Sequence, residues 1–462
     1  MMKKRVWATI MTCAVTVALL AGCAGGGQQA GGGQQAGGDA SAPETAASGE
    51  EQTEEAAAAP EDKVEVEFWY SGGKTAVAVV QEIIDDFNAS QDTYFVTAST
   101  QGSYDETYQK LQAAISGKVA PDVVLLDTDV SRSLSDKGLV TDLTPLLMAD
   151  DTFSPDDYLQ VYYQQGVDDN GKIYALPAYG TTQVMYYNIA AFEAAGVNAE
   201  DIKTWQDLAD AAKKIKDTGE FEYGWEPMWG RDNLIDAAFS NGASVFSEDG
   251  ETVTINTPEW VEVWESFRKW IHDDEIMAIH SGGQGWEYWY NTIDDVMEGT
   301  AGGYTGSSGD QADLDFSIVA AMEQPAWDAD STSAPMAEAL LLNILESSPE
   351  EEKQGAYEFV RYFTGVEAQT KWTMATGYVA VNMALSEDAD YQAYVADNPQ
   401  AGVPFSQSMH CAVYPYDPTN GAVIDALTIA CDQVEIDNIP AQEALDEAQR
   451  IAQEALDEAL GK

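Results

Sequence analysis

One cysteine near the start of the chain lies at a position that is typical of a covalently modified thiol. Cys23 directly follows Leu-Ala-Gly at the end of a short apolar run. The run has a basic start at residues 3–5 and an apolar stretch over residues 6–20, which together are typical of a secretory signal. It is shorter than the roughly 20 apolar residues that cross a bilayer. We therefore predict that residues 1–22 are a signal peptide.

The tetrapeptide Leu-Ala-Gly-Cys resembles the lipobox of bacterial lipoproteins. This resemblance implies that the Cys23 thiol takes a diacylglycerol and that Cys23 becomes the new N-terminus. Two or more acyl chains would anchor the protein on the extracellular face of the membrane. The alternative is an ordinary cleaved signal with a chance cysteine. Residues 23–61 are mostly Gly, Gln, Ala, Glu and Ser, which bury too little apolar surface to fold, and are predicted to be a disordered linker.

The rest of the chain has no phosphate-binding loop and no protease or hydrolase motif. The loop Ser71-Gly-Gly-Lys-Thr75 suggests a phosphate-binding loop, but Phe68 stands where that motif needs a glycine. The sequence has no H-E-x-x-H motif, no G-x-S-x-G motif and no Cys/His cluster with metal-ligand spacing. We expect neither a cofactor nor a metal.

The acidic residues leave one enzymatic alternative open. Two carboxylates about 5 to 10 Å apart suffice for glycoside hydrolysis. With 79 Asp and Glu residues, the sequence favours no particular pair. A cell-surface glycoside hydrolase therefore remains the alternative, while we expect a protein that is not an enzyme.

The charge of the chain restricts its partners. Only 22 Lys and Arg stand against the 79 acidic residues, for a formal net charge of −57. This charge disfavours nucleic acid, anionic membrane surfaces and strongly anionic ligands. Solubility explains most of the acidity. Of the cysteines, Cys411 and Cys431 remain in the folded part, where an exported location permits either a disulfide or two free thiols.

The folded part begins with alternating strand and helix patterns. They predict strand 64–70, helix 76–87, strand 93–99, helix 104–115 and strand 123–126. The last strand is a continuous apolar run, as in a parallel sheet that is buried on both faces. In open α/β sheets, ligands bind beyond the carboxyl ends of the strands. The loops there supply Tyr70, Ser71, Tyr104 and Asp127 as candidate ligand contacts.

Several segments of the folded part resemble a known protein family. The block from Val66 to Leu147, with FWYSGG, GSYDETYQKLQAAISGKVAPDVVLLD and KGLVTDLTPLL, is similar to the bacterial extracellular solute-binding proteins. The branch is that of glycerol-phosphate and sugar binders related to maltose-binding protein. Segments at 170–196, 204–215 and 372–382 continue the resemblance in order.

The resemblance implies a type II, periplasmic-binding-protein-like α/β fold with two lobes, each a mainly parallel sheet flanked by helices, and a hinge between them. We place the first lobe at residues 62–178 plus 335–368 and the second at 179–334 plus 369–462. The protein would be a monomer that closes over a small-molecule sugar and delivers it to the transmembrane subunits of an ABC permease. A glycan-capturing protein without a transporter is a further alternative.

Ligand contacts also follow from the resemblance. The matching positions here are Tyr104, Thr128, Thr181 or Thr182, Ser307 and Tyr378. To these we add Trp229, which lies in a loop bounded by Pro and Gly and could cover a sugar ring.

One departure from the family bears on the ligand. The glycerol-phosphate binders carry an arginine where this chain has Cys-Ala-Val-Tyr-Pro-Tyr at residues 411–416. Tyrosine cannot replace the charge that arginine offers a phosphate. We therefore predict an uncharged saccharide, preferably an oligosaccharide, with Tyr414 or Tyr416 as an aromatic contact. An acidic sugar paired with Arg231 or Lys74, or a glycerol-phosphate-type ligand, remains the alternative.

Overall fold

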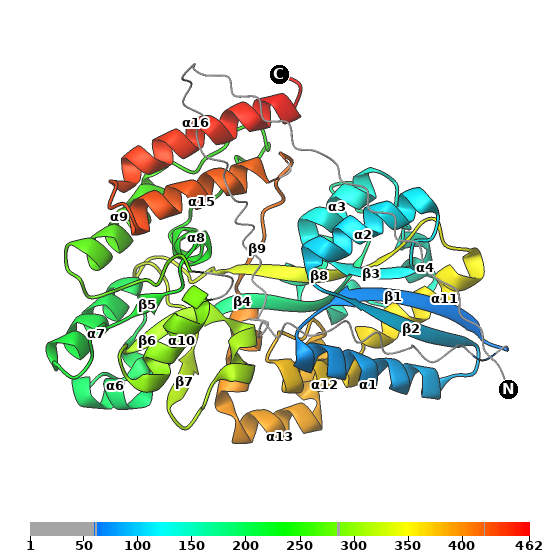
Figure 1. The fold of residues 1–462 in the computed structure, drawn as a ribbon, viewed down its shortest axis with the longest axis horizontal. Coiled ribbons are helices and arrows are strands. Elements are labelled where there is room, and N and C mark those ends of the chain that lie inside the picture. Colours follow the sequence, from blue (N-terminus) through cyan, green and yellow to red (C-terminus); the bar gives the residue numbers. More distant parts are fainter. Residues whose placement is uncertain (1–59, 61, 284–286, 420) are drawn as a thin grey trace, which may run out of the picture. The chain divides into compact units, whose positions relative to one another are not determined.

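The computed structural model describes residues 60, 62–283, 287–419 and 421–462 (Figure 1). Its first elements are β1 (Val64–Ser71), α1 (Lys74–Ser90), β2 (Tyr94–Gln101), α2 (Tyr104–Gly117) and β3 (Val123–Leu126). Strand β1 is parallel to both β2 and β3. All four residues of β3 are buried, as its continuous apolar run predicts. The predicted βαβαβ unit is confirmed.

Two strands connect this unit to the rest of the sheet, whose order is β2-β1-β3-β8-β4-β6-β5. The 13-residue β4 (Leu176–Asn188) pairs through its first part with β8 (Met336–Ile344). Its second part pairs with β6 (Gly303–Ser307) and β7 (Val319–Met322). The sheet is mixed, because β8 runs antiparallel to both β3 and β4. The short β5 (Glu226–Pro227) pairs in parallel with β6, and the short β9 (Ala412–Val413) pairs in parallel with β8.

Helices cover the sheet and fill the connections between the strands. The remaining α-helices are α3 (Thr128–Asp136), α4 (Thr144–Ala149), α5 (Gln160–Tyr163), α6 (Ile189–Ala195), α7 (Trp205–Asp217), α8 (Arg231–Ser240), α9 (Pro258–His272), α10 (Glu287–Glu298), α11 (Glu350–Phe363), α12 (Val366–Thr376), α13 (Ala389–Asp397), α14 (Val403–Ser408), α15 (Ala422–Glu435) and α16 (Ala441–Ala459). Short 3-10 helices span Pro155–Asp157, Gln164–Gly166, Ala199–Asp201, Ser308–Asp313, Met383–Glu387 and Pro399–Gly402. No described helix is long and apolar enough to cross a membrane.

The first large core gathers the apolar faces of β1, β3, β8, α1 and α11. Helix α1 contributes Val80, Ile83, Ile84 and Phe87, which recur at the helical spacing seen in the sequence. Trp372 and Tyr378 also belong to this core, although their positions in the sequence lie in the stretch assigned to the second lobe. Trp372 belongs to α12 and Tyr378 follows it directly, and α12 packs against α1 of the first core. The lobe boundaries themselves stay a prediction.

The second large core is built on the tryptophans of α9. Trp260, Trp264 and Trp270 are buried there, as the helical spacing predicts. Helix α9 contacts α15 and α16, which lie side by side in Figure 1. The repeated QEALDEA segments of α16 bury Leu445 and Leu456 in this same core. The repeat is therefore a packing face of the last helix.

Candidate ligand-binding site

Aromatic side chains meet where α2, β4 and α12 converge. The hydroxyls of Tyr104 and Tyr179 lie 2.7 Å apart. The Tyr179 ring is 5.0 Å from the Tyr378 ring and 4.6 Å from that of Trp372. Ser103 starts α2 by accepting a hydrogen bond from the Glu106 amide, which sets Tyr104 at the first position of the helix. We call Tyr104, Tyr179, Trp372 and Tyr378 the aromatic group.

Hydroxyl groups lie next to this aromatic group. Thr181 Oγ1 is 3.3 Å from Ser307 Oγ and 3.4 Å from Ser308 Oγ. A Cβ at Gly309 would come within 2.8 Å of the Tyr378 ring. A glycine is therefore required there, because any side chain would displace the ring. The structure thus brings together four predicted contacts, Tyr104, Thr181, Ser307 and Tyr378.

A charged group surrounds Tyr414. The Tyr414 hydroxyl is 3.5 Å from Asp129 Oδ2, and the positive charge of Arg231 acts on the same hydroxyl. Arg231 Nε lies 3.6 Å from Asp232 Oδ1. We call Asp129, Arg231, Asp232 and Tyr414 the Tyr414 cluster. Burial, followed by the charges of Asp127 and Asp417, raises the pKa of Asp129 to about 7.

Three buried polar atoms of the Tyr414 cluster have no hydrogen-bond partner among the described residues. They are Asp129 Oδ1, Arg231 Nε and Asp232 Oδ1. Buried polar atoms are normally hydrogen bonded, and leaving them unpaired costs free energy. These atoms can bind the hydroxyls of a polar ligand.

Trp229 lies close to this cluster. Its Nε1 donates to Asp432 Oδ1 at 2.9 Å, and its ring stands edge-on to Tyr288 at 5.0 Å. Asp232 acts electrostatically on the Tyr288 hydroxyl, so the two aromatic rings border the Tyr414 cluster. The charge of Asp127 acts on Asp129, and the Asp127 side chain caps α3 by accepting from the Val130 amide at 2.8 Å.

The other predicted contacts are held by neighbours of their own. Tyr70 is buried at the end of β1 and stacks on Phe68 at 5.1 Å, and the Oγ of the adjacent Ser71 is buried without a hydrogen-bond partner in the described part of the chain. Thr128 and Thr182 are buried and bond inside the fold, Thr128 to Gln165 Oε1 at 2.8 Å and Thr182 to the Met336 carbonyl at 2.9 Å.

Tyr416 makes its direct contacts outside the Tyr414 cluster. Its hydroxyl is 3.3 Å from Asp136 Oδ2, and the Arg132 guanidinium sits over its ring at 4.9 Å. The two candidate tyrosines of residues 411–416 therefore have different surroundings. Cys411 and Cys431 are both free thiols, so the disulfide that export would permit is absent from this structure. Cys23 lies outside the described residues.

Comparison with known proteins assigns the chain to a family. Residues 82–400 match the family described as bacterial extracellular solute-binding protein. The chain belongs to this family. Its members bind small-molecule ligands and work with ABC permeases.

Named relatives of this solute-binding protein have several ligands. It is 26% identical over 362 residues to the sn-glycerol-3-phosphate-binding periplasmic protein UgpB of Rhizobium meliloti, covering 75% of this chain and 81% of the relative. Its fold is similar to the cyclic alpha-maltosyl-1,6-maltose binding protein of Arthrobacter globiformis, with a TM-score of 0.74, 20% identity, and coverage of 86% and 100% of the two chains. UgpB from Mycobacterium tuberculosis, solved with glycerophosphocholine, gives a TM-score of 0.72, 22% identity, and coverage of 86% and 99%. The predicted type II fold is confirmed.

Some residues of the two groups were missed in the sequence of this solute-binding protein. Arg231 was considered only as a counter-ion for an acidic sugar, and Asp129, Asp232 and Tyr179 were not singled out. Asp129 could have been found, since it follows Asp127 at the same strand end. No local signal connects Arg231 with Tyr414, because only the tertiary fold brings α8 beside residues 411–416.

Proposed function

We propose that this solute-binding protein captures an uncharged saccharide, preferably an oligosaccharide, and delivers it to an ABC permease. The ligand would lie between the aromatic group and the Tyr414 cluster. A ligand that contacts both lobes stabilises the closed state, which is the state that docks on the permease.

The observation that carries this proposal is the charge around Tyr414. Asp129, Asp232 and Glu338 act on the Tyr414 hydroxyl as negative charges, and Arg231 acts as a positive one. Asp127 and Asp417 add negative charge beside Asp129. This excess of carboxylates repels an anionic ligand, whereas sugar hydroxyls can donate to carboxylates and accept from Arg231.

The aromatic residues support a sugar as well. Sugar rings have C–H faces that pack on flat aromatic side chains. Trp229 and Tyr288 border the Tyr414 cluster, and Tyr104 and Tyr378 belong to the aromatic group. Aromatic side chains at both groups suit a ligand of more than one sugar ring.

A glycerol-phosphate-type ligand is the second candidate, and Arg231 is the residue that favours it. A guanidinium can bind phosphate oxygens in a bidentate manner. Arg231, however, is buried with Asp232 Oδ1 at 3.6 Å from its Nε. Its charge is thus already offset by a neighbouring carboxylate.

Lipid attachment at Cys23 completes the proposal. Residues 23–61 would then act as a flexible tether with a random-coil span of about 35 Å. Such a tether raises the local concentration of the loaded protein near its permease.

A thermal-shift screen of the full chain tests the ligand class. The panel contains neutral mono- and oligosaccharides, glucuronic acid, sn-glycerol 3-phosphate and glycerophosphocholine. We expect a neutral oligosaccharide to raise Tm, because a ligand that binds only the folded state stabilises it. A shift with the phosphate compounds and none with neutral sugars would overturn the saccharide assignment. Cleavage of the bound oligosaccharide would instead show a glycoside hydrolase.

A further inference from the structure

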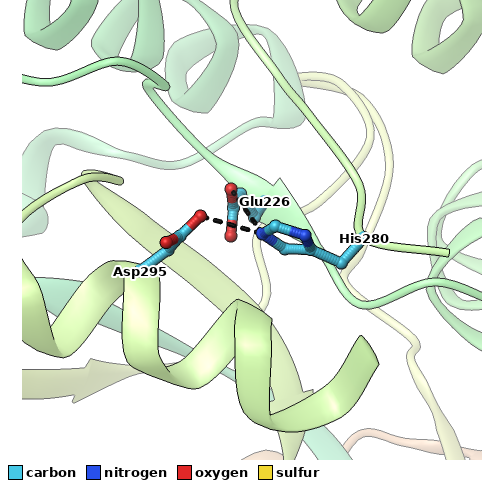
Figure 2. Close-up of side chains that lie close together, drawn as sticks. All are labelled: Glu226, His280 and Asp295. Carbon is cyan, nitrogen blue, oxygen red and sulfur yellow. Dashed lines mark hydrogen bonds and ion pairs between the residues drawn. The ribbon is translucent and has the colours of Figure 1, made fainter. Parts of the chain in front are cut away.

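Three side chains from separate segments converge in a cluster that the solute site does not use. Glu226 belongs to β5, Asp295 to α10, and His280 to the connection between α9 and α10. Figure 2 shows both carboxylates directed at the same nitrogen of the imidazole. His280 Nε2 is 2.8 Å from Asp295 Oδ2 and 3.8 Å from Glu226 Oε1. The three ligand atoms lie within 4.8 Å of one another.

Glu226 is the unusual member of this cluster. Its side chain is 0% exposed, yet neither carboxylate oxygen has a hydrogen-bond partner among the described residues. An isolated buried carboxylate is costly unless it is paired, hydrogen bonded or bound to a metal. A cation bound between the three side chains would satisfy both oxygens of Glu226.

We propose that Glu226, His280 and Asp295 bind one divalent transition-metal ion, with zinc as the best chemical match. Zinc accepts imidazole nitrogen and carboxylate oxygen at about 2.0 to 2.2 Å, usually in a tetrahedron. Tetrahedral ligand atoms at that radius are about 3.3 Å apart. The two distances from His280 Nε2, 2.8 and 3.8 Å, lie on either side of this value. Calcium fits less well, since it prefers six to eight oxygen ligands.

The ion would connect three segments that are distant in the sequence. Strand β5 leads directly into the short loop that carries Trp229, and α8 begins after this loop at Arg231. A metal bound at Glu226 therefore holds the start of that loop against α10. His280 is 32% exposed, which leaves a route for the ion from solvent. The ion would bind whichever solute the protein captures. The three ligands form no local motif, so the sequence alone predicts no metal.

Equilibrium dialysis of the full chain against zinc chloride, without sugar, tests the site. We expect one tightly bound zinc per chain. Glu226→Gln and His280→Ala should each weaken zinc binding by at least about 100-fold, since loss of a supporting residue alone costs 10- to 100-fold. His410→Ala is the matched control, because His410 pairs with Glu323 at 3.0 Å and belongs to no three-ligand group in the described part of the chain. This control should bind zinc like the unchanged protein.

Thermal unfolding gives a second readout that separates binding from folding. At about a hundredfold excess over Kd, zinc should raise Tm by about 3 °C in the unchanged protein and in His410→Ala. It should raise Tm in neither Glu226→Gln nor His280→Ala. Glu226→Gln keeps the shape of the side chain and removes a buried charge, so we expect it to fold with at least the Tm of the metal-free protein. Absence of zinc binding, equal binding by His280→Ala, or a Tm rise with calcium alone would each overturn the proposal.

Discussion

Arg231 Nε lies 3.6 Å from Asp232 Oδ1, and neither atom has a hydrogen-bond partner in the described part of the chain. A hydrogen bond needs about 3.2 Å or less between nitrogen and oxygen, so the pair attracts without satisfying either group. Arg231 thereby keeps a donor, and Asp232 an acceptor, for a polar ligand. The charge of Asp232 beside Arg231 therefore bears on whether the site prefers a neutral sugar or a phosphate.

Removing the negative charge of Asp232 should change the ligand preference. In Asp232→Asn, Arg231 loses its nearest carboxylate, so we expect weaker neutral-sugar binding, by about tenfold, because a hydrogen bond to a charged group contributes about 1.5 to 3 kcal/mol. Binding of sn-glycerol 3-phosphate should strengthen. Isothermal titration calorimetry measures both affinities. Asp201→Asn, at an exposed position outside the cluster, is the control and should change neither.

The hydroxyl of Tyr414 can be removed without removing its ring. Tyr414→Phe loses the contacts with Asp129 and Arg231, and we expect the affinity for the sugar to fall by about fivefold to tenfold. Tyr416→Phe is the matched control, because Tyr416 contacts Asp136 and Arg132 instead. If Tyr416→Phe lowered the affinity more than Tyr414→Phe, the ligand would lie nearer Tyr416 than we propose.

The close approach of Gly309 and Tyr378 predicts a sensitive position. In Gly309→Ala the new Cβ would meet the Tyr378 ring at 2.8 Å, so the ring must shift and its packing on Tyr179 must change. We expect a loss of about 1 to 3 kcal/mol in the free energy of unfolding, together with weaker ligand binding. Denaturant unfolding and calorimetry measure the two effects. Gly117→Ala is the control, since its Cβ would find an ordinary contact at 3.5 Å, and equal losses in both variants would contradict the argument.

The raised pKa of Asp129 predicts a dependence of stability on pH. The folded protein binds this proton up to a pKa of about 7, whereas the unfolded carboxyl releases it near 4. The folded state therefore loses stability as the pH rises from about 4 to about 7, and the loss persists above 7. Asp129→Asn removes this contribution, so its Tm relative to the unchanged protein should be higher at pH 8 than at pH 5. A relative Tm that is the same at both values would show that Asp129 titrates normally.

The proposed lipid anchor at Cys23 should affect location and not recognition. Cys23→Ala removes the thiol that would be acylated, so we expect the protein to leave the membrane fraction. Its affinity for the ligand should stay unchanged, because the tether takes no part in the site. Fractionation of cells followed by calorimetry of the released protein measures both. A variant that stayed on the membrane, or that bound ligand more weakly, would contradict this role.

Local patterns in the sequence determined the secondary structure well. The βαβαβ unit, the buried tryptophans of α9 and the packing face of α16 follow from hydrophobic periodicity over a few turns. Thr204 caps α7 and forms a capping box with Asp207, three residues further along the chain. These features depend on residues that are neighbours along the chain, which is why the sequence alone reveals them. The succession of family-like segments likewise indicated the fold and family.

Only the tertiary structure decided which polar side chains meet. It placed Arg231 of α8 beside Tyr414, and it gathered Glu226, His280 and Asp295 from three segments. It also directed the hydroxyls of Thr128 and Thr182 into internal hydrogen bonds that a residue type cannot foretell. The physical reason is that the charge balance and hydrogen bonding of a site depend on contacts across the chain. Those contacts are set by how β4 and β8 join the sheet, and no local pattern contains them.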